Sequence, residues 1–301
     1  IVRCFRDEDL RADRQPEFTQ IDIEMSFVDV DDVLALGEGL IMSLYRELKG
    51  IAADSPIPRM TYADAMELYG TDKPDLRFGL PLKDITGIFQ GTEFGVIKKT
   101  INEGGIIKAV VLKGKTLSRK DLDTAVDAAK DMGAGGLIWI RKENDALQSP
   151  VVKFMKDEEK ASLSEVFELS NGDVLFIVAD KKDKTNEVMG RFRLYIGEKF
   201  GLIDKTKDKL LWVTDFPLLE YSELEKRYIA RHHPFTSPKE SIRNFNGDYE
   251  SIIARAYDLV LNGVEIGGGS IRNYRMDEQL EMFRLLDRKS TRLNSSHIAV
   301  S

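Results

Sequence analysis

The first 27 residues constrain the fold most, because they join strand-like alternation to a highly charged loop. Apolar and polar residues alternate from Gln20 to Phe27, a period of two that predicts a strand with one apolar and one polar face. Residues 2–5 suit an antiparallel partner strand, and the loop between them, 7–17, carries charges of both signs. We interpret the stretch as a long hairpin whose polar side can line a site. On composition alone, the alternative is an edge hairpin with a solvated loop.

Composition limits the class of protein. With 301 residues the chain is long enough for about two domains, and its apolar fraction of 42% allows a sizeable core. A net charge of -7 argues against a nucleic-acid binder that uses its whole surface, but it leaves room for a local basic patch. The single cysteine, Cys4, excludes an internal disulfide framework and fits a reducing compartment such as the cytoplasm. The histidines and the cysteine lack zinc-site spacing, and no apolar run approaches the ~20 residues of a membrane span.

Beyond the hairpin, periodicity predicts a mixture of helices and strands, an α+β chain. Helices are expected at 29–49, 61–69, 118–132, 157–168, 186–200, 249–261 and 277–286. Strands are expected at 106–112, 136–141, 173–179, 210–219 and 263–272, with a further short apolar run at 94–97. Asp29 or Asp31, Thr61 and Ser118 can cap helices, and Asn262-Gly263 is expected to stop the helix at 249–261. The polar stretch 70–77 suggests a surface loop.

The middle of the chain, 81–184, has the pattern of a self-contained α+β module of about 100 residues. It contains no convincing catalytic cluster. The segment Gly133-Ala-Gly-Gly136 is no phosphate loop, because it lacks the lysine and Ser/Thr of that motif and precedes a strand rather than a helix.

Three consecutive glycines, 267–269, lie inside a predicted strand and need a physical reason, since glycine weakens a strand. A bulge, or close approach by a ligand or another backbone, would supply one. Glu265 and Arg272 are seven residues apart, so strict alternation would place them on opposite faces. A bulge between them would bring both toward one cavity.

Three segments resemble one known family. The string Phe5-Arg-Asp-Glu-Asp-Leu-Arg-Ala-Asp-Arg-Gln-Pro-Glu-Phe-Thr-Gln-Ile-Asp22 resembles the second signature motif of class II aminoacyl-tRNA synthetases of the bacterial aspartyl type. Arg231-His-His-Pro-Phe-Thr-Ser-Pro238 and Gly263–Arg272 match further segments in the family's order. The resemblance extends to about residue 286. It implies an antiparallel synthetase sheet with flanking helices, incomplete here and interrupted by an inserted α+β domain shared with an amidotransferase subunit.

The resemblance implies an ATP-dependent aspartate–tRNA ligase, an enzyme of translation, and a set of site residues. Arg6 would be the catalytic residue, with its guanidinium on the α-phosphate and the attacking carboxylate. ATP would be bound by Asp7, Glu8, Gln15, Phe18 and Glu265. Mg²⁺ would be held by Asp258 and Glu265. The substrate L-aspartate would be bound by Asp22, His232 and Arg272. Arg11 and Arg14 would contact the tRNA acceptor end. Without the resemblance, Phe18 fits a core strand, the paired histidines a surface turn, and Asp258 an exposed helix position.

The resemblance also implies a division of the chain. Residues 1–80 and 188–287 would form two parts of a catalytic domain, 81–187 the inserted domain, and 288–301 a non-native tail. Because Ile1 is no initiator methionine and the third signature motif is absent, we expect an inactive internal fragment of a homodimeric parent. The parent would charge tRNA-Asp, with tRNA-Asn as an open addition, and no membrane or DNA partner is expected. Rival interpretations are an asparaginyl- or lysyl-type synthetase and a non-catalytic synthetase-like binding protein.

Overall fold

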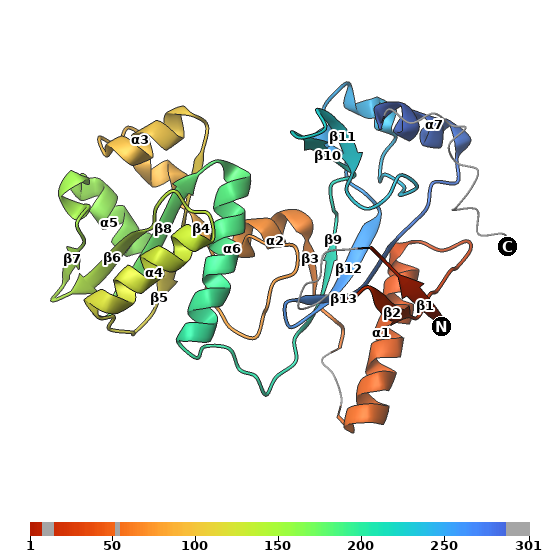
Figure 1. Ribbon diagram of the computed structural model, residues 1–301, viewed down its shortest axis with the longest axis horizontal. Coiled ribbons are helices and arrows are strands. Elements are labelled where there is room, and N and C mark those ends of the chain that lie inside the picture. The colour runs from red at the N-terminus through yellow and green to blue at the C-terminus, as the bar shows by residue number, and fades with distance from the viewer. Residues whose placement is uncertain (8–14, 52–54, 287–301) are drawn as a thin grey trace. The chain divides into compact units, whose positions relative to one another are not determined.

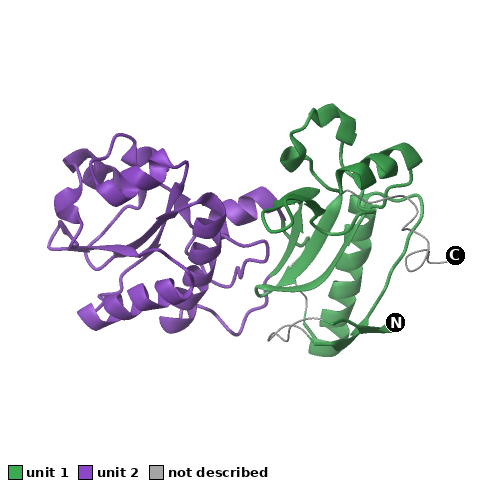
Figure 2. Ribbon diagram, turned by 45° about the horizontal axis from the view of Figure 1, so that its top comes forward, with its two compact units in different colours: residues 1–59, 210–301 green, residues 60–209 purple. Residues whose placement is uncertain are grey.

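The computed structural model describes residues 1–7, 15–51 and 55–286. Contacts divide the chain into two units, which Figure 2 shows in separate colours: unit 1, residues 1–59 and 210–301, and unit 2, residues 60–209. The predicted boundaries at 80/81 and 187/188 both fall inside unit 2. The second would cut a continuous helix, α6 (Lys182–Lys199). The family-based division therefore stays a prediction.

Unit 2 is built on an antiparallel sheet with the strand order β4-β5-β8-β6-β7 (Figure 1). The strands are β4 (Lys83–Asp84), β5 (Ile106–Leu112), β6 (Ile138–Glu143), β7 (Ala146–Gln148) and β8 (Val174–Asp180). Alternate residues of β8 enter two cores. Phe176 packs with α4 (Arg119–Asp131) and α6, and Ile177 packs with α3 (Gly95–Asn102) and α5 (Asp157–Val166). Because helices cover both faces, the central strand β8 is an almost continuous apolar run.

Two buried cations tie the peripheral segments of unit 2 to its core. Lys108 of β5 is fully buried and donates to the Glu67 carbonyl at 2.7 Å, at the end of α2 (Tyr62–Tyr69), and to the Glu67 carboxylate at 2.9 Å. Arg193 of α6 is 2% exposed and holds the segment 75–80 through four backbone carbonyls. The segment 70–77, predicted as a surface loop, is therefore partly buried along α6. A buried cation caps carbonyls that no sheet or helix would otherwise satisfy.

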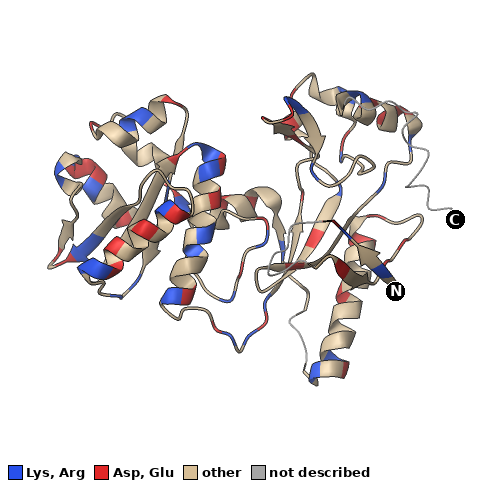
Figure 3. Ribbon diagram, viewed as in Figure 1, with Lys and Arg blue, Asp and Glu red and all other residues tan. Residues whose placement is uncertain are grey.

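Both signs of charge are interspersed along α4, α5 and α6 rather than gathered on one face (Figure 3). Several of these charges form pairs within one helix, for example Arg119 with Asp123 in α4 and Arg191 with Glu187 in α6. Such exposed pairs contribute little to stability, so the pattern is that of a solvated helical layer.

Unit 1 contains an antiparallel sheet in which β12 (Ala256–Leu261) lies between β13 (Val264–Ser270) and β9 (Leu210–Thr214). One face packs on α1 (Val30–Leu44), with Leu34, Tyr257, Leu259 and Trp212 in a shared core. Asp29 caps α1 in a capping box with Asp32, as predicted, and a π-helical turn, Tyr45–Lys49, leads to the stop at Gly50. The remaining elements are β1 (Val2–Phe5), β2 (Glu17–Gln20), β3 (Arg59–Thr61, at the unit boundary), β10 (Leu219–Ser222), β11 (Arg227–Ala230) and α7 (Met276–Leu285).

Several local predictions were wrong. The segment 249–261 is no helix: a short 3-10 turn, Tyr249–Ser251, precedes β12, because an apolar run buried on both faces does not distinguish strand from helix by period. Asn262 and Gly263 both have positive φ and form the two-residue β12–β13 hairpin turn, not a helix stop. The run 94–97 enters helix α3.

The predicted strand at 20–27 is wrong, because β2 spans Glu17–Gln20 and shares only Gln20 with it, and the predicted strand at 210–219 is shorter than expected. β2 ends at Gln20, so the alternating residues 21–27 continue without a strand partner, and Ile21, Ile23, Met25 and Phe27 are exposed. β9 ends at Thr214, where Asp215 adopts a φ of 60°. The mixed α+β architecture with antiparallel sheets and flanking helices is confirmed.

Candidate active site

The β12–β13 hairpin places the predicted metal and substrate residues on one face. Asp258 pairs with Gly268, and Val260 pairs with Glu265, so Ile266 is one extra residue in β13. Directly paired residues share a face, and this bulge therefore puts Glu265 on the same face as Gly268, Ser270 and Arg272. The predicted bulge is confirmed. It lies just before the glycines rather than among them.

Two of the three glycines are explained by close contacts. A Cβ on Gly268 would lie 2.3 Å from Asp258 Oδ1, and a Cβ on Gly269 would lie 2.9 Å from the Tyr257 ring. Gly267 has no neighbour within 4 Å of such an atom. Gly268 thus leaves room for the Asp258 carboxylate on the site face, and Gly269 leaves room for Tyr257 on the face that packs on α1.

His232 lies over the same face and approaches Asp258. Its Nε2 is 3.8 Å from Asp258 Oδ1, and its ring meets Phe216 edge-on at 4.8 Å between centroids. Its Nδ1 is buried and has no hydrogen-bond partner among the described residues. Asp258, predicted as a possible helix position, is a strand residue whose side chain is 15% exposed.

Arg272 is held by the 233–238 segment. This segment pairs with residues 271–273 through backbone hydrogen bonds. The N–H of Ser237 donates to the Ile271 carbonyl, and the N–H of Asn273 donates to the Phe235 carbonyl. Arg272 Nη1 donates to Ser270 Oγ at 3.1 Å and to His233 Nδ1 at 3.1 Å. Partial burial lowers the pKa of Arg272, while the nearby charge of Glu24 raises it. The segment after β2 therefore lies near this arginine. Sequence reasoning missed His233 and Ser270, although their spacing from His232 and Arg272 could have indicated them.

The hairpin carries the other predicted residues on an exposed surface. β1 and β2 pair antiparallel, and Arg6 stacks on Phe18 at 5.2 Å from the ring centroid. Asp7, Gln15 and Asp22 are exposed, and Asp22 lies beyond β2 rather than on it, contrary to expectation. Glu8, Arg11 and Arg14 lie outside the described residues. Within the described part of the chain, the hydrogen bonds of Arg272 go to His233 and Ser270 rather than to Asp22, so the shared site of Asp22 and Arg272 stays a prediction.

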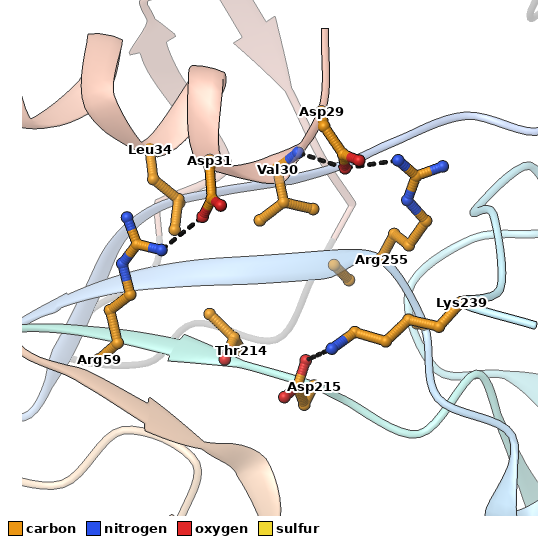
Figure 4. Close-up of a pocket in the computed structure, with 11 residues that line it drawn as sticks. Asp29, Val30, Asp31, Leu34, Arg59, Thr214, Asp215, Lys239 and Arg255 are labelled. Atoms are coloured by element: carbon orange, nitrogen blue, oxygen red, sulfur yellow. Dashed lines mark hydrogen bonds and ion pairs between the residues drawn. The ribbon is translucent and has the colours of Figure 1, made fainter.

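A cavity of about 540 Å³ lies on the α1 side of the unit 1 sheet and contains none of the predicted site residues (Figure 4). Its charged residues form three pairs: Asp29 with Arg255, Asp31 with Arg59 at 2.5 Å, and Asp215 with Lys239 at 2.5 Å. The hydrogen bond from Arg255 lowers the pKa of Asp29. Since the described charges that line it neutralise one another, this cavity suits structural packing better than recognition of a charged substrate.

Carboxylates suitable for a hard cation lie on the site face, but not as a closed cage. Among the described residues, no group of three or more His, Cys, Asp or Glu side chains could hold a metal ion alone. Asp258 and Glu265 share a face, and two carboxylates completed by phosphate oxygens are a usual arrangement for Mg²⁺. The donor set therefore fits a metal that arrives with a nucleotide.

Comparison with known proteins decides the family. A family model described as tRNA synthetases class II (D, K and N) matches residues 1–297. The chain belongs to this family. The aspartate–tRNA(Asp/Asn) ligase of Aquifex aeolicus (strain VF5) is 49% identical over 95% of this chain and 50% of its own length.

Two further relatives are also named aspartate–tRNA ligases and match to a similar extent. The aspartate–tRNA(Asp/Asn) ligase of Desulfosudis oleivorans (strain DSM 6200 / JCM 39069 / Hxd3) is 51% identical over 95% of this chain and 48% of its own length. The aspartate–tRNA ligase of Shouchella clausii (strain KSM-K16) is 49% identical over 95% and 49%. The chain thus spans about half the length of the curated relatives that it matches. In the part of this synthetase chain that the structure describes, no helix is long and apolar enough to cross a membrane.

Proposed function

We propose that this chain forms the core of an aspartate–tRNA ligase, which activates L-aspartate with ATP and transfers the aspartyl group to the 3′ end of tRNA-Asp. The observation that carries the proposal is the arrangement of Asp258, Glu265 and Arg272 on one face of the β12–β13 hairpin. The names of the relatives favour aspartate over asparagine and lysine, which the D, K and N family also includes.

Arg272 is the proposed selector of the substrate. Its guanidinium can meet the side-chain carboxylate of aspartate with two parallel hydrogen bonds, which lysine could not supply. His232, whose Nε2 lies 3.8 Å from Asp258 Oδ1, would contact the same ligand, and Asp22 would accept from the α-ammonium group. Asparagine carries a neutral amide in place of this carboxylate, and its NH₂ group could not accept a hydrogen bond from the Arg272 guanidinium.

ATP would lie between the hairpin and the glycine strand. Phe18 offers a ring face to adenine, and Asp7, Glu8, Gln15 and Glu265 supply polar groups around the nucleotide. Asp258 and Glu265 would hold Mg²⁺ against the phosphates, where the cation would neutralise charge on the pyrophosphate leaving group. Gly268 contributes by leaving the Asp258 carboxylate its space.

The first step needs no protein nucleophile. An oxygen of the substrate α-carboxylate attacks the α-phosphorus, the bond to the β-phosphate bridging oxygen breaks, and aspartyl-adenylate and pyrophosphate form. Arg6 would bind both the attacking carboxylate and the α-phosphate, so that it orients them and stabilises the growing negative charge. In the second step the ribose hydroxyl of the tRNA terminus displaces AMP.

The wider assembly follows from the same proposal. Arg11 and Arg14 would contact the tRNA acceptor end, the parent enzyme would be a cytoplasmic homodimer, and 81–187 would be the inserted domain. Charging of tRNA-Asn in addition to tRNA-Asp is a finer alternative.

Amino-acid-dependent pyrophosphate exchange tests the proposal in the complete polypeptide that carries this sequence. Exchange should depend on aspartate, and Arg272→Leu should abolish aspartate activation while ATP binding persists. Exchange with asparagine or lysine but not aspartate would overturn the substrate assignment. If no amino acid supports exchange, a non-catalytic binding protein becomes the better interpretation.

A further inference from the structure

Among the described residues, Arg272 is held through one of its two terminal nitrogens, Nη1. Nη1 donates to His233 Nδ1 at 3.1 Å and to Ser270 Oγ at 3.1 Å. A guanidinium has five N–H groups, two of them on Nη1. Both protons of Nη1 are therefore committed to neutral acceptors of the protein.

The surroundings fix the tautomer of His233. The backbone N–H of Phe235 also donates to His233 Nδ1, at 3.1 Å. Because two donors meet at Nδ1, this nitrogen must be unprotonated and the ring proton must lie on Nε2, which is 3.5 Å from Ser270 Oγ. Thr236 Oγ1 also lies 3.5 Å from the Ser270 hydroxyl. Arg272 is thus held by neutral groups, with its positive charge left for another partner.

The remaining donors of Arg272 define how a ligand can approach. Among the described residues, Arg272 makes no further hydrogen bond, and no carboxylate lies within 4 Å of it. The Nε–H and the two Nη2 hydrogens remain available. Nε–H and one Nη2–H are parallel and match the two oxygens of a carboxylate, whereas an approach to the Nη1/Nη2 end would find Nη1 occupied.

We propose that His233 and Ser270 are positioning residues that hold Nη1 of Arg272, so that the substrate carboxylate binds the Nε/Nη2 edge. This inference rests on the proposed function, because it specifies how the same arginine meets aspartate. The arrangement favours a carboxylate over a carboxamide, since an amide presents one acceptor and one donor to two fixed donors. His233 and Ser270 would therefore affect discrimination against asparagine without touching the substrate.

The test compares variants that remove or keep the acceptor at His233 in the complete polypeptide. His233→Leu removes the acceptor, and His233→Asn keeps a carbonyl oxygen near the position of Nδ1. Loss of a hydrogen bond to a charged group predicts a KM for aspartate roughly tenfold higher in His233→Leu. The KM for ATP should stay within about twofold, and His233→Asn should recover most of the loss. Ser270→Ala should raise the KM for aspartate in the same direction, by about threefold.

Pyrophosphate exchange with aspartate, asparagine and varied ATP provides every readout, and thermal melting checks the fold. An unchanged KM for aspartate in a folded His233→Leu protein would overturn the positioning role while leaving the proposed function intact. Equal rises in the KM for aspartate and ATP, without recovery in His233→Asn, would also refute it as a general structural effect. Absence of aspartate-dependent exchange in the unaltered protein would overturn the proposed function and this inference together.

Discussion

Arg193 in unit 2 and Arg272 in unit 1 are both bound by neutral acceptors, yet they leave different donors free. Arg193 donates through Nε to the Leu80 carbonyl at 3.0 Å and through Nη2 to three more carbonyls of segment 75–80 at 2.8–3.0 Å. The rings of Tyr69 and Phe78 flank it at 4.7 and 4.0 Å. Arg272 instead donates through Nη1 alone to the residues that the structure describes, and none of them bonds to its Nε/Nη2 edge.

The comparison shows that the edge of a guanidinium that the protein occupies indicates its role. In Arg193 the occupied groups include Nε and Nη2, the pair best suited to a carboxylate, so no such ligand can bind there. Burial lowers the pKa of Arg193 to about 10, which still leaves it charged at neutral pH. Backbone carbonyls stabilise that charge and are themselves satisfied by it. Arg193 is therefore a structural residue, and Arg272 is suited to a ligand.

The largest expected effect is on stability, from Arg193→Met. The change should destabilise unit 2 by on the order of 3–5 kcal/mol, because it leaves four carbonyls of segment 75–80 without their buried partner. The two tryptophans lie in different units, Trp139 in unit 2 and Trp212 in unit 1. In a Trp212→Phe background, urea unfolding followed by fluorescence should report unit 2.

Arg191→Met is the matched control for this change. Arg191 lies on the same helix, its side chain is 55% exposed, and it makes an ion pair with Glu187 at 3.7 Å. Its loss should cost less than about 1 kcal/mol. Equal unfolding midpoints for the two variants would contradict a structural role specific to Arg193.

A smaller loss of stability is expected from changing Gly190, the glycine of α6 that lets segment 70–80 approach this helix. A Cβ on Gly190 would lie 2.7 Å from the Gly70 carbonyl oxygen, a backbone atom that cannot swing away. Gly190→Ala should therefore destabilise unit 2 by about 2–3 kcal/mol, despite the better helix propensity of alanine. Urea unfolding followed by fluorescence in the Trp212→Phe background measures this change in stability.

Gly39→Ala tests whether replacing a helical glycine by alanine raises or lowers the free energy of unfolding where the added methyl group meets no close neighbour. Gly39 lies within α1, and a methyl group at this position would have no neighbour within 4 Å among the residues that the structure describes, so alanine should stabilise the chain by about 0.5–1 kcal/mol. The two substitutions are chemically identical. If both stabilised the protein, close packing of Gly190 on Gly70 would be refuted.

The smallest stability effect is expected for Arg272→Leu, the variant predicted to lose aspartate activation. Because Arg272 has two neutral partners among the described residues and a partly exposed side chain, its removal should change the free energy of unfolding by no more than about 0.5 kcal/mol. Thermal or urea unfolding of the 301-residue chain measures this. A loss as large as that of Arg193→Met would end the contrast between the two arginines.

The sequence predicted elements best where local chemistry decides them. The predicted caps at Asp29 and Ser118 are confirmed, and the predicted helix ends at 49 and 132 are each followed by a glycine of positive φ, Gly50 and Gly133. The strand 256–261 was missed because burial on both faces removes its period. The Asn262-Gly263 pair is typical of a two-residue hairpin turn, so the prediction that it stops a helix was wrong.

The candidate site was predictable in its residues but only partly in its geometry. The glycine run and the spacing from Glu265 to Arg272 indicated a bulge, which places both residues on one face. The contacts of His233, Ser270 and Arg272 could not be predicted, because they depend on how segment 233–238 pairs with 271–273. Such pairing between distant segments is set by tertiary packing rather than by local pattern.

Because Ile266 is one extra residue in β13, the direction of the Arg272 side chain depends more on the number of residues in the strand than on which residues they are. If the bulge persists, deleting one residue between Ile266 and Arg272 would turn Arg272 toward α1, whereas many substitutions would preserve its direction. Insertions and deletions in this stretch should therefore be far less tolerated than replacements. Sequence alignments of relatives should place no gap between these two residues.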